Sequence, residues 1–181
     1  MKLIEKKLEE KEIYVGRVVR FHVDKVELQN GRTSIRECVD HPGGVSVAVL
    51  TDKDEMLFVR QFRYPYRQAV LEAPAGKLEK GEDPFEAMKR EQKEETGTTG
   101  TGYLELGKLY PSPGYTDEII YLYACRAESF GETDFDDDEF LQVERIPVDK
   151  AVEMIMNNEI PDAKTQVLVL KTARLLKEGK I

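Results

Sequence analysis

The chain has 181 residues, of which 40% are hydrophobic and 34% are charged. This length allows one well-filled core with at most a small accessory sheet, and the composition is typical of a soluble globular protein without a membrane span. A net charge of −8 repels a phosphate backbone, so we expect no nucleic acid among its partners. The N-terminus lacks the apolar stretch of a secretory signal, which favours a cytoplasmic location.

The cysteines and histidines show no metal-ligand spacing along the sequence. Cys38 and Cys125 lie far apart and outside any C-x-x-C pair, and His22 and His41 are isolated. The pattern indicates neither a disulfide framework nor a zinc site, and we assign these four side chains no chemistry. An acidic protein that acts on phosphates instead needs a cation bound by oxygen ligands.

The N-terminal part of the chain is predicted to form a small antiparallel sheet. Runs rich in β-branched and aromatic residues cover residues 13–15, 17–28 and 33–39, and Asn30-Gly31 is a strong hairpin signal between the last two. The apolar pattern then predicts further strands at residues 45–50, 56–62 and 70–75.

A helix is predicted over residues 84–96, with signals at both ends. Asp83 is a suitable N-cap, Pro84 fits the first turn, and Gly97 supplies the stop. Downstream we expect strands at residues 103–110, 119–125 and 140–146, an acidic segment at 128–139, and helices at 148–157 and 163–178, the last capped by Asp162. Strands around one central helix, followed by terminal helices, indicate an α+β or mixed α/β sandwich.

Three carboxylates converge on the central helix. Glu91 and Glu95, at i and i+4, share a face with Glu94 beside them, while Phe85 and Met88 fall on a stripe that faces the core. An acidic helix face can simply be solvated. However, like charges at this spacing destabilise a helix unless something neutralises them, and a divalent cation does so. We therefore expect a Mg²⁺ site on this helix.

The segment from Gly76 to Gly97 resembles the Nudix box. It carries all seven fixed polar and glycine positions of the box, and such a match by chance has odds on the order of one in a billion per start site. These positions are Gly76, Glu82, Arg90, Glu91, Glu94, Glu95 and Gly97. Gln92 and Thr98 depart from the box, which usually has bulky aliphatic residues there. If Gln92 is buried, it must find hydrogen-bond partners.

The resemblance implies a fold and a set of metal ligands. The fold is a Nudix-type α/β/α sandwich with a small N-terminal antiparallel sheet. Glu91 and Glu95 would be the principal Mg²⁺ ligands, Glu94 an additional ligand, and the Ala75 carbonyl would complete the site. Mn²⁺ is expected to substitute for Mg²⁺.

Motifs outside the box resemble the ADP-ribose pyrophosphatase branch of this family, and they extend the resemblance over most of the chain. They are Ser112-Pro113-Gly114, the stretches at residues 59–63 and 71–77, and the N-terminal hairpin followed by Arg36-Glu37 and residues 41–43. This branch implies that residues 1–42 pack across a two-fold homodimer and contribute to an adenosine pocket. Residues 43–181 would then form the hydrolase domain.

Four residues are candidates for contacts with a nucleotide-sugar substrate. Arg63 is the candidate for the diphosphate, because a guanidinium fork matches phosphate oxygens; the alternative interpretation is a surface or dimer salt bridge. Arg36 is a weaker candidate of the same kind. Pro113 and Gly114 are assigned to the substrate by the resemblance.

The catalytic base is expected in the acidic segment. In this branch the base comes from a loop that corresponds to residues 135–140. Glu139, the only glutamate in that run, is the first choice, and Asp137 is the second because its side chain is shorter; a solvated loop is the alternative. Glu94 and Glu95 complete the expected catalytic set. The base would remove a proton from the attacking water.

The expected reaction is Mg²⁺-dependent hydrolysis of ADP-ribose to AMP and ribose 5-phosphate. Another nucleoside-diphosphate sugar, such as GDP-mannose or ADP-glucose, is the rival substrate, because the box supplies only the diphosphate chemistry. A third interpretation is a non-catalytic module that senses ADP-ribose. That interpretation predicts lost carboxylates, whereas this chain keeps every carboxylate of the box.

Overall fold

The computed structural model describes residues 3–135 and 140–181, and these divide into two compact units. The first unit contains residues 3–43 and 110–119, and the second contains the rest of the described chain. Residues 110–119, which the sequence-based division grouped with residues 43–181, therefore cluster with the N-terminal sheet. Within the first unit, the Val39 N–H donates to the Tyr115 carbonyl at 2.7 Å, and the Asp117 N–H donates to the Val39 carbonyl at 3.2 Å.

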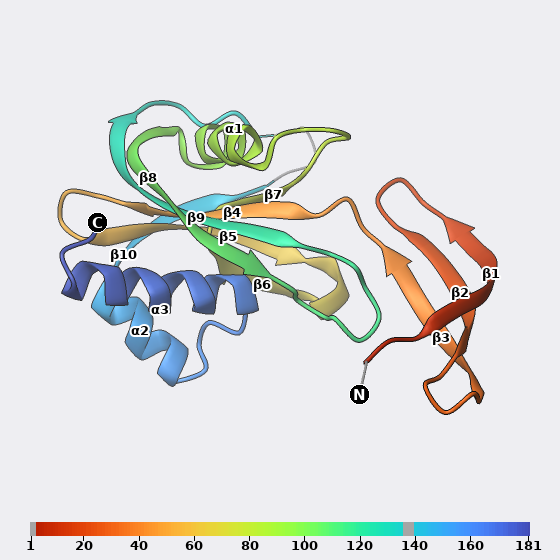
Figure 1. Cartoon of the computed structure of the whole chain (residues 1–181). Coiled ribbons are helices and arrows are strands. Elements are labelled where there is room, and N and C mark those ends of the chain that lie inside the picture. The colour runs from red at the N-terminus through yellow and green to blue at the C-terminus, as the bar shows by residue number, and fades with distance from the viewer. Residues whose placement is uncertain (1–2, 136–139) are drawn as a thin grey trace. The chain divides into compact units, whose positions relative to one another are not determined.

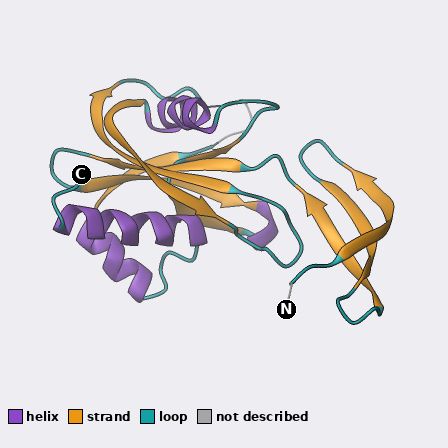
Figure 2. Cartoon of the chain, viewed as in Figure 1, coloured by secondary structure: helices purple, strands orange, loops and turns teal. Residues whose placement is uncertain are grey.

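The described part of the first unit is a three-stranded antiparallel sheet in the order β1-β2-β3 (Figure 2). Its strands are β1 (Lys6–Val15), β2 (Arg20–Glu27) and β3 (Thr33–Asp40). The predicted hairpin is confirmed: Gly31 has a φ of 77°, and the Asn30 side chain accepts a hydrogen bond from the Arg32 N–H at 3.1 Å. β1 begins at Lys6, seven residues before the predicted strand at residues 13–15. The earlier start was not predicted, because the first half of β1 is charged and exposed, as edge strands often are, and has no apolar pattern.

The described residues of the second unit form a seven-stranded mixed sheet. Its path is β10-β5-β4-β9-β8, with β6 beside β5 and β7 beside β4, and only the β4–β9 pairing is parallel among these strands. The bounds are β4 (Gly44–Leu50), β5 (Glu55–Arg63) with the 3₁₀ turn η1 (Tyr64–Tyr66), β6 (Gln68–Glu72), β7 (Ala75–Lys77), β8 (Thr98–Leu109), β9 (Ile120–Phe130) and β10 (Gln142–Pro147).

The strand predicted at residues 70–75 is interrupted in the structure. β6 ends at Glu72 and pairs with β5, whereas β7 starts at Ala75 and pairs with β4. Between them the Pro74 carbonyl accepts hydrogen bonds from the Val47 N–H at 3.0 Å and from the Ser46 hydroxyl at 2.8 Å. This break carries the chain from one strand of the sheet to another and brings β7 next to the central helix.

Helices cover both faces of this sheet (Figure 1). They are α1 (Pro84–Thr96) on one face and α2 (Val148–Met156) with α3 (Ala163–Lys177) on the other. Val45, Val47 and Val49 of β4 pack in the core under α1, and Ala48 and Leu50 pack in the core under α2 and α3. The predicted α/β/α sandwich is confirmed. Across the described chain, none of the helices combines the length and the apolar character needed to cross a membrane.

The helix ends follow the signals in the sequence. The Asp83 carboxylate accepts a hydrogen bond from the Phe85 N–H at 3.0 Å, and Gly97 ends α1 in the left-handed region with a φ of 64°. Asp162 caps α3 by accepting a hydrogen bond from the Thr165 N–H at 2.9 Å. All three caps were predicted. Asp83 and Gly97 fix the two ends of α1, the helix that carries the box glutamates.

The two departures from the box are hydrogen-bonded to each other. Gln92 is completely buried, and its side-chain amide donates to the Thr98 hydroxyl at 3.1 Å. Its amide oxygen accepts hydrogen bonds from the Tyr103 hydroxyl at 3.0 Å and the Cys125 thiol at 3.6 Å. The expectation that a buried Gln92 needs partners is confirmed, and the network joins α1 to β8 and β9.

Gln92→Leu is expected to lower the free energy of unfolding by about 1 to 3 kcal/mol. The Tyr103 hydroxyl would lose the amide oxygen that accepts its hydrogen bond, and the Thr98 hydroxyl would lose the amide that donates to it. Urea denaturation measures this loss. The double variant Gln92→Leu/Tyr103→Phe removes the orphaned hydroxyl as well and should recover part of it. Additive losses in the double variant would show that the network does not act as a unit.

Candidate functional site

The three box glutamates lie in the C-terminal half of α1, close to the start of β7. Glu95 is buried, with 3% of its surface exposed, and its carboxylate accepts a hydrogen bond from the Ala75 N–H at 2.8 Å. Glu91 lies one turn earlier and is partly buried, whereas Glu94 is more exposed. Carboxylates from α1 and the backbone of Ala75 from β7 are thus brought together at one place.

Arg90 connects these carboxylates to the loop before the helix. Its Nε and Nη2 donate to the Glu82 carboxylate at 3.1 and 3.2 Å, and its Nη1 donates to Glu91 at 2.8 Å and to Glu94 at 2.9 Å. Arg90, together with the backbone N–H of Glu79, holds the pKa of Glu82 below its usual range. The guanidinium therefore offsets the repulsion among the carboxylates and ties the loop to the helix.

Gly76 leaves the space that the Glu91 carboxylate occupies. A Cβ atom at this position would lie 1.8 Å from the carboxyl carbon of Glu91 and 1.9 Å from its Oε1. The carboxylate is thus packed directly against the loop backbone. Carboxylate and backbone oxygens are the donors that Mg²⁺ and Mn²⁺ prefer, so the residues present fit such a cation.

Arg63 lies in a partly buried ionic cluster that the sequence did not reveal. Its Nε and Nη2 bind the carboxylate of Glu72 at 2.6 and 2.7 Å, and the Lys164 ammonium binds the same carboxylate and, at 3.0 Å, that of Asp162. Hydrogen bonds to Glu72 raise the pKa of Arg63, although burial alone would lower it. The negative charges of Asp162 and Glu95 raise it further. Arg63 is therefore paired with Glu72, yet it lies within electrostatic reach of Glu95 on α1.

Glu72→Gln is expected to lower the free energy of unfolding by about 3 kcal/mol at neutral pH, because it removes the buried negative charge that pairs with Arg63 and leaves Lys164 with Asp162 as its carboxylate partner. We take the lower end of the usual range because the Arg63 side chain is 39% exposed and partly solvated. Burial alone would raise the pKa of Glu72, but Arg63 and Lys164 outweigh burial and lower it.

The pH dependence of this difference tests the assignment. The folded-state pKa of Glu72 is below its unfolded value, so its contribution is complete above about pH 4.3 and is lost as the pH falls through the folded-state pKa. The gap between wild type and Glu72→Gln in urea denaturation should therefore close in acid. A gap that stays constant down to pH 2 would contradict the lowered pKa.

The other candidate substrate residues belong to the first unit. Arg36 forms a two-pronged pair with Glu5, with its Nε at 2.9 Å and its Nη2 at 2.5 Å from the two carboxylate oxygens. Pro113 and Gly114 lie in the segment 110–119, which is held to the end of β3. The guanidinium fork of Arg36 is thus engaged by a carboxylate, as that of Arg63 is.

Glu139 and Asp137, the candidate bases, lie outside the described residues. The beginning of their segment is nevertheless anchored on α1. The Gly131 N–H donates to the Gly97 carbonyl at 2.7 Å, and the Asp134 N–H donates to the Glu94 carbonyl at 2.9 Å. The chain therefore enters the acidic run from the end of the helix that carries the box glutamates.

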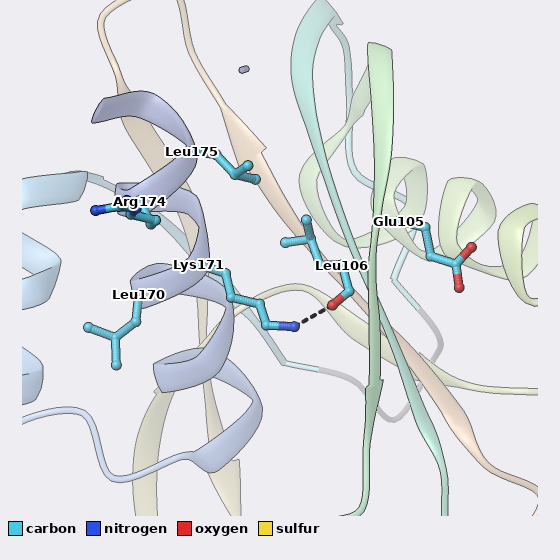
Figure 3. Close-up of a pocket in the computed structure, with 6 residues that line it drawn as sticks. All are labelled: Glu105, Leu106, Leu170, Lys171, Arg174 and Leu175. Atoms are coloured by element: carbon cyan, nitrogen blue, oxygen red, sulfur yellow. Dashed lines mark hydrogen bonds between the residues drawn. The ribbon is translucent and has the colours of Figure 1, made fainter. Parts of the chain in front are cut away.

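A separate groove of about 480 Å³ lies between β8 and α3 (Figure 3). It is lined by Glu105, Leu106, Leu170, Lys171, Arg174 and Leu175, and the Lys171 ammonium donates to the Leu106 carbonyl. The groove is on the α3 side of the sheet, whereas the box glutamates are on the α1 side. It is therefore distinct from the carboxylate cluster.

The α/β/α sandwich thus gathers, near the C-terminal end of α1, carboxylates of the kind that bind divalent cations. The NUDIX domain matches residues 40–168 of this sequence. The chain is also 40% identical over 177 residues to the ADP-ribose pyrophosphatase of Bacillus subtilis, covering 94% of this chain and 96% of that protein. The chain therefore belongs to the Nudix family, and the resemblance inferred from the box is confirmed.

Two further relatives have other names. The methanol dehydrogenase activator of Bacillus methanolicus is 42% identical over 167 residues, covering 91% of this chain and 90% of that protein. The GDP-mannose pyrophosphatase of Yersinia enterocolitica is 31% identical over 151 residues, covering 78% of each chain. The relatives therefore share most of their length with this chain but differ in what their names say they act on.

Proposed function

We propose that the chain hydrolyses ADP-ribose to AMP and ribose 5-phosphate with Mg²⁺, and that Mn²⁺ can replace Mg²⁺. The observation that carries this proposal is the arrangement of three box glutamates: Glu95 accepts a hydrogen bond from the Ala75 N–H, Glu91 packs against Gly76, and Arg90 joins Glu91 to Glu94. ADP-ribose is favoured over GDP-mannose because the ADP-ribose pyrophosphatase relative is 40% identical over 94% of the chain, against 31% over 78% for the GDP-mannose pyrophosphatase.

Glu91, Glu94, Glu95 and the Ala75 carbonyl would hold the cation, which stabilises charge on phosphoryl oxygens and lowers the pKa of bound water. The chain prepares this site before any ligand arrives. Arg90 holds Glu91 and Glu94 in place at 2.8 and 2.9 Å, and the Ala75 N–H holds Glu95. The carboxylates therefore need little reorganisation when the cation and the diphosphate bind.

Arg63 is our candidate for an additional contact with the diphosphate. Its pair with Glu72 uses two of the five N–H donors of a guanidinium, so the pair does not prevent a contact with phosphate oxygens. Arg36, Pro113 and Gly114 are also proposed to contact the substrate. Arg63→Lys keeps the charge but loses the fork, so it should raise KM for ADP-ribose more than it lowers kcat.

Glu139 is the proposed base, with Asp137 as the second choice. The anchoring of Gly131 and Asp134 on α1 supports a base from this segment. Glu139→Gln should lower kcat by about 10² to 10⁴, the usual contribution of a general base, and Asp137→Asn should have a smaller effect. If Asp137→Asn has the larger effect, the role moves to Asp137.

We also propose that residues 1–42 mediate a homodimer. β1 is exposed along its whole length in the single chain, and Ile13, Tyr14, Val15 and Ile35 are among the exposed large side chains. Burial of such apolar surface against a second copy would stabilise the sheet. Sedimentation equilibrium should give twice the mass of one chain, and Val15→Lys should shift the equilibrium toward the monomer.

A product assay tests the proposed reaction. The purified protein is incubated with ADP-ribose, GDP-mannose, ADP-glucose or NADH, each with Mg²⁺ and with EDTA. Metal-dependent release of AMP that is fastest from ADP-ribose is the expected result. Preference for another sugar nucleotide would retain the chemistry and change the substrate, whereas binding of ADP-ribose without turnover would indicate a sensing module.

A second candidate function is activation of a methanol dehydrogenase. It rests on the 42% identity to the methanol dehydrogenase activator over 91% of this chain. The rate of a methanol dehydrogenase is measured with and without this protein, and Glu95→Gln serves as the comparison. Activation by the wild type would support this function, and activation that persists in Glu95→Gln would separate it from hydrolysis.

A further inference from the structure

The first unit brings together three side chains that could bind a metal. His22 and Asp24 are alternate residues of the central strand β2, and Cys38 on β3 is the cross-strand partner of His22. One ligand atom from each of the three lies within 4.8 Å of the others. Alternate residues of a strand and a direct cross-strand partner point to the same face of a sheet, so the backbone itself holds the three side chains together.

Two of the three are the best-buried polar side chains among the described residues of the first unit, and Cys38 is partly buried. His22 is 6% exposed and Asp24 is 8% exposed. Among the described residues of this unit, Val26 is the only hydrophobic side chain classed as buried. A small sheet with so little apolar core needs another source of stability, and metal ligation and association with a second chain are the usual ones.

Both ring nitrogens of His22 face carboxylates. Its Nδ1 lies 2.8 Å from Asp24 Oδ1, and its Nε2 lies 3.1 Å from Asp40 Oδ1. The other oxygen of Asp40 accepts a hydrogen bond from Arg20 Nη1 at 2.8 Å. Histidine ligands of metals usually donate their second ring N–H to a carboxylate that is itself held in place, and Asp40 with Arg20 has this arrangement.

We propose that His22, Asp24 and Cys38 bind a zinc-type divalent cation, with Asp40 as the carboxylate that orients His22. The ligands would be His22 Nδ1, the Asp24 carboxylate and the Cys38 sulfur, with water in the fourth position. In a tetrahedral site, ligand bonds of about 2.0 to 2.3 Å place the ligand atoms about 3.3 to 3.8 Å apart, so small side-chain rotations suffice.

The chemistry of this ligand set distinguishes it from the site on α1. A nitrogen and a sulfur ligand favour Zn²⁺ over Mg²⁺, which prefers oxygen ligands only. One carboxylate and one thiolate also balance the double charge of the cation, and a neutral cluster is tolerated in a buried position. The bound ion would join β2 to β3 and stabilise the first unit, independently of the hydrolytic reaction.

Cobalt is the probe for this site, because tetrahedral Co²⁺ has visible d–d bands and a thiolate ligand adds a near-ultraviolet charge-transfer band. The full-length protein is titrated with Co²⁺ in excess Mg²⁺, so that the carboxylate site on α1 is occupied. We expect one equivalent of Co²⁺ to produce both sets of bands and one equivalent of Zn²⁺ to remove them. The absence of a thiolate band in the wild type would overturn the proposal.

Variants assign the ligands. Cys38→Ser should abolish the thiolate band, while Cys125→Ala, which changes the other cysteine in the core of the second unit, should leave it unchanged. Asp40→Asn should weaken Co²⁺ binding by about 10-fold to 100-fold without removing the band, as expected when the partner of a histidine ligand is changed. A band that survives in Cys38→Ser or disappears in Cys125→Ala would refute the assignment.

A stability measurement completes the test. Zn²⁺ should raise the thermal midpoint of the wild type, and this rise should be absent in Cys38→Ser. Hydrolysis with Mg²⁺ should remain at the wild-type rate in Cys38→Ser, so the zinc site and the proposed reaction can fail separately. An equal effect of Zn²⁺ on wild type and variant would contradict the proposal.

Discussion

Glu95→Gln is expected to lower kcat by roughly 10³-fold while the protein stays folded, an effect of the size seen when one preorganised electrostatic group is removed. The amide oxygen of glutamine can still accept the hydrogen bond that the Ala75 N–H donates to Glu95 at 2.8 Å. The substitution also removes a like-charge pair with Glu91 at i and i+4, which costs an isolated helix about 0.2 to 0.5 kcal/mol. The thermal midpoint should therefore be unchanged or slightly higher.

Glu86→Gln is the matched control for this variant. Glu86 is on the same helix, but it is exposed and forms an ion pair with Lys89 at 2.8 Å, away from the box carboxylates. Its substitution should leave kcat within about twofold, because exposed ion pairs contribute little. Hydrolysis of ADP-ribose in a Mg²⁺ titration measures both variants. A near-wild-type rate for Glu95→Gln would remove Glu95 from the proposed metal site.

Features that depend on neighbouring residues could be predicted from the sequence. Asp83 and Gly97 fix the ends of α1 by local hydrogen bonds and backbone conformation, so both ends were predicted correctly. The helical repeat alone places Glu91 and Glu95 on one face, and in the structure Glu95 contacts Ala75 and Glu91 packs against Gly76. The order of strands and helices predicted a mixed α/β class, and the α/β/α layering was implied by the resemblance to the Nudix box.

Features that depend on long-range pairing could not be predicted in the same way. Glu72 is nine residues from Arg63 and ninety-two from Lys164 in the sequence, and the pairing of β6 with β5 and the packing of α3 bring the three together. The stretch around Glu72 helped to identify the branch, yet no spacing rule gave its role. His22 and Cys38 likewise meet only through the register of β2 and β3, so their separation in sequence indicated no site.

Gly76→Ala is expected to lower kcat/KM for ADP-ribose by about 10²-fold, the size of effect that a misplacement of 1 Å produces at an active site. The added Cβ would lie 1.8 Å from the carboxyl carbon of Glu91, so this side chain has to leave its position. Glu91 would then lose the hydrogen bond that Arg90 donates to it at 2.8 Å in the wild type. The Mg²⁺ concentration needed for the half-maximal rate should therefore rise.

Two further variants show whether this clash is the cause. Gly131→Ala adds the same methyl group where the nearest atom, the Gly97 carbonyl oxygen, is 3.5 Å away, so activity and stability should stay at wild-type levels. In Gly76→Ala/Glu91→Ala the clashing carboxylate is absent, so the thermal midpoint should recover relative to Gly76→Ala while the activity remains low. If Gly76→Ala hydrolyses ADP-ribose at the wild-type rate and Mg²⁺ concentration, then the position of Glu91 against the loop backbone is not required for catalysis.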